Sequence, residues 1–212
     1  MCINRTLIMF ILTWTLSACI NPQIYSTVQH HTISLEAESL ITNGIAFITP
    51  STVTGQEEDK QALALTFAEV LADKRPDITI VTLPETLRAI ARNKLTADYK
   101  IMFDDFKNTG IFNREIINKV GKATGTRYLA QLKLASFNQG TIGRWSLLGI
   151  RMSQTKYADI RLFFQIWDSA DGTIAWEGVE ELNYARDTAK EQAIAFRTVI
   201  EVAAQNLIAR LP

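Results

Sequence analysis

The sequence predicts an α/β (α+β) fold in which helices pack on a single mixed sheet and a helix closes the chain. Two observations predict this class. Up to residue 124, short apolar segments alternate with amphipathic segments of helical length, which is typical of parallel strands joined by helices. After residue 127, apolar residues recur at every second position, which indicates antiparallel strands. The expected order of elements is β-α-β-α-α-β-β-β-α.

The first half begins with a buried strand, because residues 44–50, GIAFITP, are apolar and end in a proline. A helix is expected at 56–72, where apolar residues recur at i, i+4, i+7 and i+8 from Leu63 and three acidic residues fill the first turn. The remaining elements of this half are a strand at 78–83, a helix at 84–95 opened by Pro84, a short helix at 97–112, and a helix at 113–124 ended by Gly125.

The second half is expected to be an antiparallel meander. Residues 127–134 and 157–167 alternate apolar and polar side chains, as half-buried strands do. The turn at Asp171-Gly172 then returns the chain as a strand at 173–184, so these two strands form a hairpin. The last element is a long amphipathic helix at 188–211.

Length and charge limit the possible functions. The 212 residues suit one folded domain, assigned to 43–212, preceded by a targeting segment at 1–18 and a flexible tether at 19–42. Twenty-two basic residues balance twenty-two acidic ones, so no overall field favours nucleic acid, and no nucleic-acid partner is expected.

Residues 1–18 have the composition of a signal peptide. Arg5 is their one charged residue, and it precedes an apolar run at 7–16 that is too short for a transmembrane helix. An uncleaved anchor or a buried helix would be the alternative, and the small residues that follow the run argue against both.

Leu16-Ser17-Ala18-Cys19 resembles the bacterial lipobox. The resemblance implies cleavage between Ala18 and Cys19 and covalent lipid on Cys19, which attaches the chain to a membrane. Cys2 would leave with the signal peptide, so residues 19–212 would carry no free thiol and no disulfide. Ile20 takes the place of the aspartate that marks inner-membrane retention, which implies an outer-membrane location facing the periplasm.

The search for catalytic motifs is negative. The chain has no phosphate-binding glycine loop and no nucleophile elbow, and its two histidines, His30 and His31, lie in the expected tether as solvated residues. Asp104 and Asp105 are expected on the solvent-facing side of a short helix. The chain is therefore expected not to be an enzyme, with no metal and no cofactor apart from the lipid on Cys19.

Two features could serve binding. Residues 138–154 are rich in glycine and apolar residues; as a loop they would expose a partner-binding surface, and as a strand they would cover part of the core. The candidate contacts are Ile142, Trp145, Leu147 and Leu148. The second feature is Trp167 with Trp176, expected to pack as a pair across the hairpin; with Tyr157, they could instead line a ligand pocket.

Residues 164–178, FQIWDSADGTIAWEG, resemble a hallmark of a periplasmic lipoprotein superfamily, in which a strand ends in Asp and the return strand carries Trp-Glu. Residues 44–50 and 121–129 resemble its first strand and its helix-to-strand passage. The superfamily includes the CsgG-like curli-secretion lipoprotein, the amino-terminal domain of TolB, and lipoprotein activators of peptidoglycan synthases. The resemblance implies a non-catalytic domain that binds other envelope proteins. Pore-forming members of the superfamily insert two amphipathic hairpins to make a barrel. Only residues 138–154 are a candidate for such a hairpin here, so an accessory role is expected instead of pore formation.

The function expected from the sequence is thus that of a lipid-anchored interaction subunit of a cell-envelope complex, in secretion or in control of peptidoglycan synthesis. A homo-oligomer is compatible with this role. One alternative is a lipoprotein that binds a small ligand or glycan. The other is a hydrolase, for which Asp104, Asp105 and Asp168 would have to converge.

Overall fold

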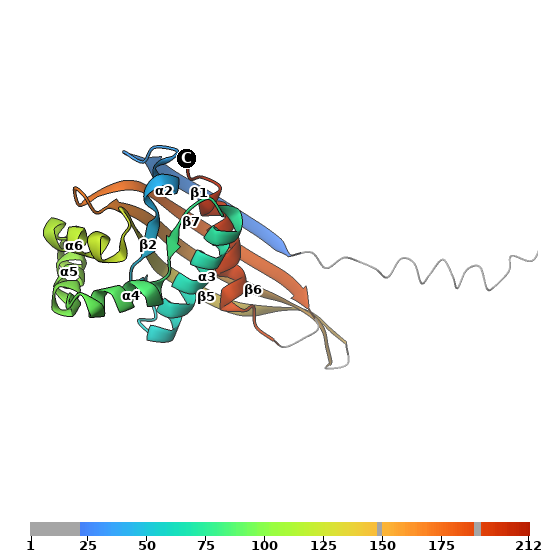
Figure 1. The fold of residues 1–212 in the computed structure, drawn as a ribbon. Helices are drawn as coiled ribbons and strands as arrows, with labels where there is room; N and C mark the ends of the chain where they lie inside the picture. The colour runs from blue at the N-terminus through green and yellow to red at the C-terminus, as the bar shows by residue number, and fades with distance from the viewer. Residues whose placement is uncertain (1–21, 148–149, 189–191) are drawn as a thin grey trace, which may run out of the picture.

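In the computed structural model, which describes residues 22–147, 150–188 and 192–212, one curved sheet is flanked by helices (Figure 1). The described strands are β1 (Gln23–Thr32), β2 (Ile45–Phe47), β3 (Ser51–Thr52), β4 (Ile80–Val81), β5 (Tyr128–Leu147), β6 (Ile150–Asp168) and β7 (Thr173–Thr188). The described helices are α2 (Ser39–Asn43), α3 (Glu57–Lys74), α4 (Leu83–Arg92), α5 (Thr96–Thr109), α6 (Arg114–Thr124) and α7 (Phe196–Ile208).

The sheet is mixed, which confirms the predicted fold class. Its strands lie in the order β1-β7-β6-β5-β2-β4, and β3 also pairs with β5. β2 runs parallel to β4 and β5, whereas β5, β6, β7 and β1 form antiparallel neighbours. Three helices join β4 to β5. α5 ends at Gly110 in the left-handed conformation, and the Asn113 side chain accepts hydrogen bonds from the first turn of α6, which separates these two helices.

The N-terminal segment belongs to the sheet, so the prediction of a flexible tether at 19–42 is wrong for its larger part. β1 pairs with β7 along its whole length, from Gln23 opposite Ala185 to Thr32 opposite Trp176. The Val28 side chain packs on the core, and Leu35 and Leu40 are buried within it. β1 is an edge strand whose residues are all exposed except the half-buried Val28, so most of its side chains are polar and its sequence resembles a linker.

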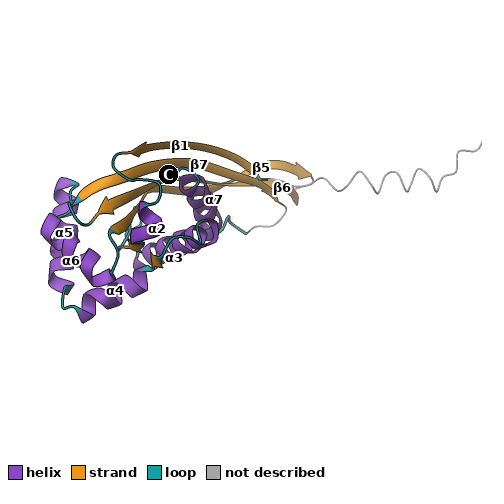
Figure 2. Cartoon of the chain, turned by 45° about the horizontal axis from the view of Figure 1, so that its top comes forward, coloured by secondary structure: helices purple, strands orange, loops and turns teal. Residues whose placement is uncertain are grey.

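The main core fills the space between the sheet and two helices, α3 and α7 (Figure 2). Inward side chains of β5, β6 and β7 alternate with outward ones, as the period of a strand requires. Phe164 of β6 contacts Phe67 of α3 with ring centroids 4.7 Å apart, and Val199, Ala203 and Leu207 of α7 are fully buried.

A second, smaller core lies on the opposite face of the sheet. β2 supplies both cores, since Ile45 and Phe47 face the main one while Ala46 and Ile48 face α4, α5 and α6. The helices of the second core cover β2, β4, the start of β5, the end of β6 and the start of β7. Over the rest of this face, along β1, most of β7 and β6 and the middle of β5, there is no helix in the described part of the chain (Figure 2).

The C-terminal helix begins later than predicted. β7 continues to Thr188, which pairs with Gln154 of β6, so the expected helix at 188–211 is wrong over its first residues. The helix runs from Phe196 to Ile208 instead. No helix in the described part of the chain is both long and apolar enough to cross a membrane.

Candidate functional surfaces

Several predicted site residues lie outside the described residues. These are Ala18 and Cys19 with the rest of the segment 1–18, and also Leu148. Lipidation of Cys19 and cleavage before it therefore stay predictions.

Residues 138–147 and 150–154 lie in two paired strands. β5 extends to Leu147 and pairs with β6 from Ile150 onward, with register shifts near Trp145. Ile142 is 56% exposed, so at this position the strand does not cover the core. The side chains of Trp145 and Leu147 lie outside the described part of the structure, so partner binding by these residues and by Ile142 stays a prediction.

The two tryptophans do not pair with each other. Trp176 of β7 lies opposite Ile166 of β6, and Trp167 is the next residue of β6, so its side chain points to the other face of the sheet. As a result Trp176 enters the main core and Trp167 enters the second core, on opposite faces of the sheet. Both are almost fully buried, at 0% and 2% exposed, so the predicted aromatic pocket of Tyr157, Trp167 and Trp176 is wrong.

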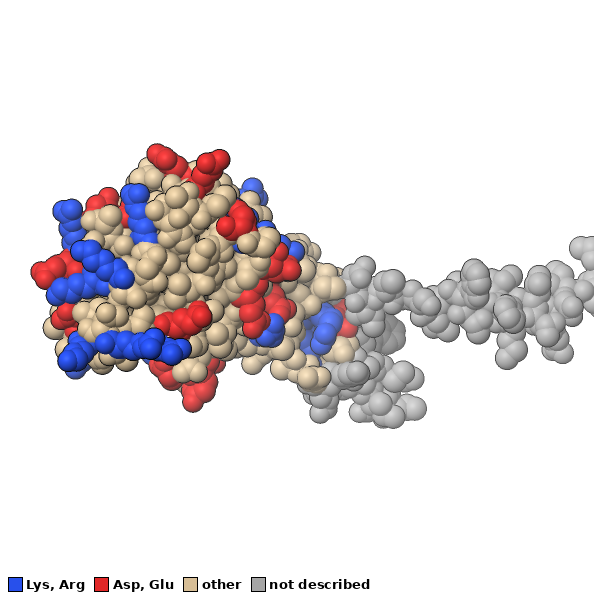
Figure 3. Space-filling model, viewed as in Figure 1, with Lys and Arg blue, Asp and Glu red and all other residues tan. Residues whose placement is uncertain are grey.

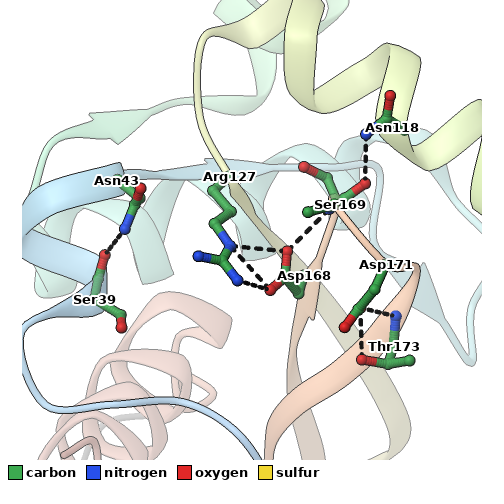
Figure 4. A network of polar contacts seen from close by, with 9 residues as sticks. Ser39, Asn43, Asn118, Arg127, Asp168, Ser169, Asp171 and Thr173 are labelled. Atoms are coloured by element: carbon green, nitrogen blue, oxygen red, sulfur yellow. Dashed lines mark hydrogen bonds and ion pairs between the residues drawn. The ribbon is translucent and has the colours of Figure 1, made fainter.

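Asp168 has a structural partner. Arg127 donates from Nε and Nη2 to the Asp168 Oδ2 atom, at 2.9 and 2.6 Å, and the Ala170 amide donates to Oδ1 at 2.9 Å (Figure 4). The Asn118 amide group donates to the Ser169 carbonyl at 3.0 Å, which ties α6 to the same turn. Asp104, by contrast, is exposed on α5 beside a surface hollow that Asp168 does not line.

The turn between β6 and β7 thus explains the motif that resembles the lipoprotein superfamily. Gly172 has a φ of +78°, and a Cβ at this position would lie 3.0 Å from the Arg114 Cβ. The position therefore favours glycine both in backbone conformation and in space. The Asp and Gly of the motif hold the turn against α6 and the start of β5.

Glu180 is a buried carboxylate where three elements meet. It is 0% exposed on the core side of β7. Its Oε1 atom accepts from Ser26 Oγ of β1 at 2.6 Å and from Asn206 Nδ2 of α7 at 3.0 Å, while Oε2 has no hydrogen-bond partner among the described residues. Burial raises the pKa of Glu180, and the two hydrogen bonds and the charge of Arg210 offset part of this rise.

We expect Glu180→Gln to reduce the dependence of stability on pH. A raised pKa means that the folded protein holds the proton more tightly, so the wild type loses stability as the pH rises from the ordinary carboxyl pKa through the folded one. Glutamine carries no charge to desolvate, so the stability of the variant relative to that of the wild type should increase as the pH rises. Thermal unfolding measured from pH 4 to pH 8 tests this expectation, and parallel curves for the two proteins would contradict it.

The uncovered part of the sheet forms an open sheet face. Its described side chains point away from the main core, and they are Tyr25, Thr27, Gln29, His31, Ser136, Asp159, Arg161, Phe163, Gln165, Glu177, Val179, Glu181 and Asn183. Polar pairs join neighbouring strands across it: Arg161 donates to Glu181, and Asn183 donates to Asp159.

Two shallow hollows lie on the open sheet face. One, of about 240 Å³, is lined by His31, Phe163 and Glu177 among others, and the second, of about 480 Å³, includes Tyr25 and Arg161. Tyr25 is 69% exposed, the largest exposure among the large hydrophobic residues described. Tyrosine and arginine are the types that most often anchor protein–protein interfaces.

Charged side chains of both signs are mixed on the surface shown in Figure 3. Within the described ranges, no three His, Cys, Asp or Glu side chains lie close enough together to hold a metal ion.

Neither a protein-family model nor a curated protein matches the chain. Several solved structures do match it. The PelC dodecamer from Paraburkholderia phytofirmans is 10% identical over 88% of this chain and 97% of that chain, with a TM-score of 0.47. Lipoprotein GNA1162 from Neisseria meningitidis is 14% identical over 79% and 98%, with a TM-score of 0.39. A putative neuraminyllactose-binding hemagglutinin homolog from Helicobacter pylori is 10% identical over 84% and 88%, with a TM-score of 0.38.

Proposed function

We propose that this chain is a lipoprotein of the outer membrane, anchored through Cys19 and facing the periplasm, that acts as a non-catalytic protein-binding subunit of a cell-envelope complex. Secretion and control of peptidoglycan synthesis are the two settings that the sequence resemblance supports. The observation that carries the proposal is the open sheet face, which has an exposed Tyr25 beside Arg161 and which no helix of residues 22–147, 150–188 and 192–212 covers.

The open sheet face suits a protein partner better than a small molecule. Its hollows are shallow and spread across four strands, whereas small-molecule sites are usually concave and bury most of the ligand. Its cross-strand pairs present both signs of charge, which gives specificity to a protein interface rather than a general attraction.

The anchor would also orient the domain. Gln23, Ala185, Tyr157 and Gly140 lie in one row across the sheet. Cys19 stands four residues before Gln23, which limits its distance from this row to about 14 Å. β5 and β6 extend beyond the row, so the end of their hairpin would face the membrane. Residues 138–158 contain Arg144, Arg151 and Lys156 but no acid, a composition suited to anionic lipid headgroups.

Photo-crosslinking in intact cells tests the proposal. A photoreactive phenylalanine analogue replaces Tyr25 on the open sheet face, and in a matched strain it replaces Leu65, which is 38% exposed on α3 in the opposite layer. We expect one envelope protein to be captured from position 25 and not from position 65. The product should disappear when Cys19→Ala is added, because the unlipidated precursor would not reach the membrane.

Two results would refute parts of the proposal separately. Normal processing and membrane location of the Cys19→Ala variant would refute the lipid anchor. Equal capture from positions 25 and 65, with a lipidated Cys19 confirmed by mass spectrometry, would refute the open sheet face as the binding surface.

A further inference from the structure

A third hollow, of about 640 Å³, lies where the loop after β2 meets α5 and β5. Three lysines from different elements line it: Lys60 of α3, Lys107 of α5 and Lys133 of β5. Asp104 is the one acidic residue among its described lining residues. We name it the lysine hollow, because it concentrates positive charge in a chain whose total charge is balanced.

Two of these lysines are available to a ligand. Lys60 is paired with Glu57 at 3.3 Å. Lys107 and Lys133 form no ion pair with any other described residue, and the Lys133 ammonium lies 5.9 Å from the centre of the Phe163 ring. Two ammonium groups without a carboxylate partner therefore line one cavity.

The walls of the lysine hollow are held in place before any ligand binds. Ser51 and Thr52 form β3, which pairs with β5 at Lys133 and Leu134. The Thr49 amide donates to the Tyr99 hydroxyl of α5 at 2.9 Å. These contacts hold the loop after β2 against both β5 and α5. Little conformational entropy would therefore be lost when a ligand binds. The loop also follows the carboxyl end of parallel strand β2, where α/β sheets commonly bind ligands.

The lining includes groups that suit an organic portion of a ligand. Phe103 and Phe106 of α5 supply an apolar wall. Gln131 is only 2% exposed, and its Oε1 atom has no hydrogen-bond partner in the described part of the chain. A buried acceptor without a partner costs free energy, which a ligand hydroxyl or amine could recover.

We propose that the lysine hollow binds a soluble phosphoryl-bearing small molecule. A phosphoryl group carries close to two negative charges at neutral pH, which matches two free ammonium groups, whereas one carboxylate carries a single charge. Lysine binds phosphate as a compact point charge, and the hydroxyls of Ser51 and Thr52 can donate to its oxygens. This site does not involve the lipid anchor, and it borders the open sheet face, since Lys133 of β5 lies opposite Phe163 of β6.

Isothermal titration calorimetry of the purified full-length protein with pyrophosphate tests the proposal, at low ionic strength because salt screens the attraction. We expect saturable binding at one site. Lys107→Gln and Lys133→Gln should each weaken it by about tenfold or more, as the loss of a hydrogen bond to a charged group does. Asp104→Asn should strengthen it, because it removes the opposing charge.

Lys122→Gln is the matched control, since Lys122 is an exposed lysine of α6 that does not line the hollow. It should leave the affinity unchanged, and malonate should bind more weakly than pyrophosphate. Absence of pyrophosphate binding, an equal loss in Lys122→Gln, or equal affinity for malonate would each overturn the proposal. Thermal unfolding of each variant confirms that it is folded. The lipid state of Cys19 does not enter these measurements, so failure here leaves the proposed function intact.

Discussion

Replacing Trp176 with alanine is expected to lower the free energy of unfolding by about 3–5 kcal/mol, the usual cost of removing a large buried aromatic side chain. Trp176 is fully buried between β1, β6 and α7, with its ring centroid 5.4 Å from Phe164 and stacked on His30 at 6.4 Å. Urea denaturation followed by circular dichroism measures the loss, since a shift of the midpoint with an unchanged slope reports stability alone.

The cost is large because one neighbour of the Trp176 ring is a glycine, which cannot fill the space that the ring leaves. The ring covers Gly178, where an added Cβ would lie 2.5 Å from the Trp176 Cη2 atom and 3.0 Å from the Leu207 Cδ2 atom. With the ring removed, glycine has no side chain to move into the cavity. Small domains have only about 5–15 kcal/mol of stability, so this loss is a large fraction of the total.

Tyr25→Ala is the control for this prediction, because it also removes an aromatic ring but from a side chain that is 69% exposed. We expect its effect to stay within about 0.5 kcal/mol. A loss below about 1 kcal/mol for Trp176→Ala, or an equal loss in the two variants, would contradict the account of the main core.

The sequence predicted the elements whose signals are local. The helix at α6 ends where expected, because Gly125 takes a positive φ of 73°. Pro84 lies in the first turn of α4, as expected from its fixed φ. The hairpin of β6 and β7 follows from its alternation and its Asp-Gly turn, and these signals need no knowledge of distant partners.

The features that the sequence did not predict depend on distant contacts. β1 is a strand because β7 pairs with it, and its own side chains are mostly exposed and polar. The separation of Trp167 from Trp176 depends on the register of the hairpin, which places Trp176 opposite Ile166 and therefore on the other face from the adjacent Trp167. Lys60, Lys107 and Lys133 lie far apart in the chain, so only the folded structure brings them to one hollow.

The ion pair of Arg127 with Asp168 should respond unequally to removal of its two members. The Asp168 side chain is 5% exposed, whereas that of Arg127 is 49% exposed. Arg127→Ala leaves a buried carboxylate with the Ala170 amide as its remaining partner, and we expect a loss of about 2–3 kcal/mol. This is less than the usual cost of breaking a fully buried pair, because water already reaches half of Arg127.

Asp168→Ala should cost less, about 1–2 kcal/mol, since the guanidinium that remains can turn to water and the main loss is the acceptor for the Ala170 amide. Urea denaturation of the two variants measures which of them loses more free energy of unfolding. Asp168→Asn keeps an acceptor for the Ala170 amide, so its loss should be smaller than that of Asp168→Ala. A larger loss for Asp168→Ala than for Arg127→Ala would mean that the turn depends on the Ala170 contact more than on the charge pair. Because the Asp belongs to the motif that resembles the lipoprotein superfamily, the order of these losses decides whether the motif acts through its ion pair or through the turn itself.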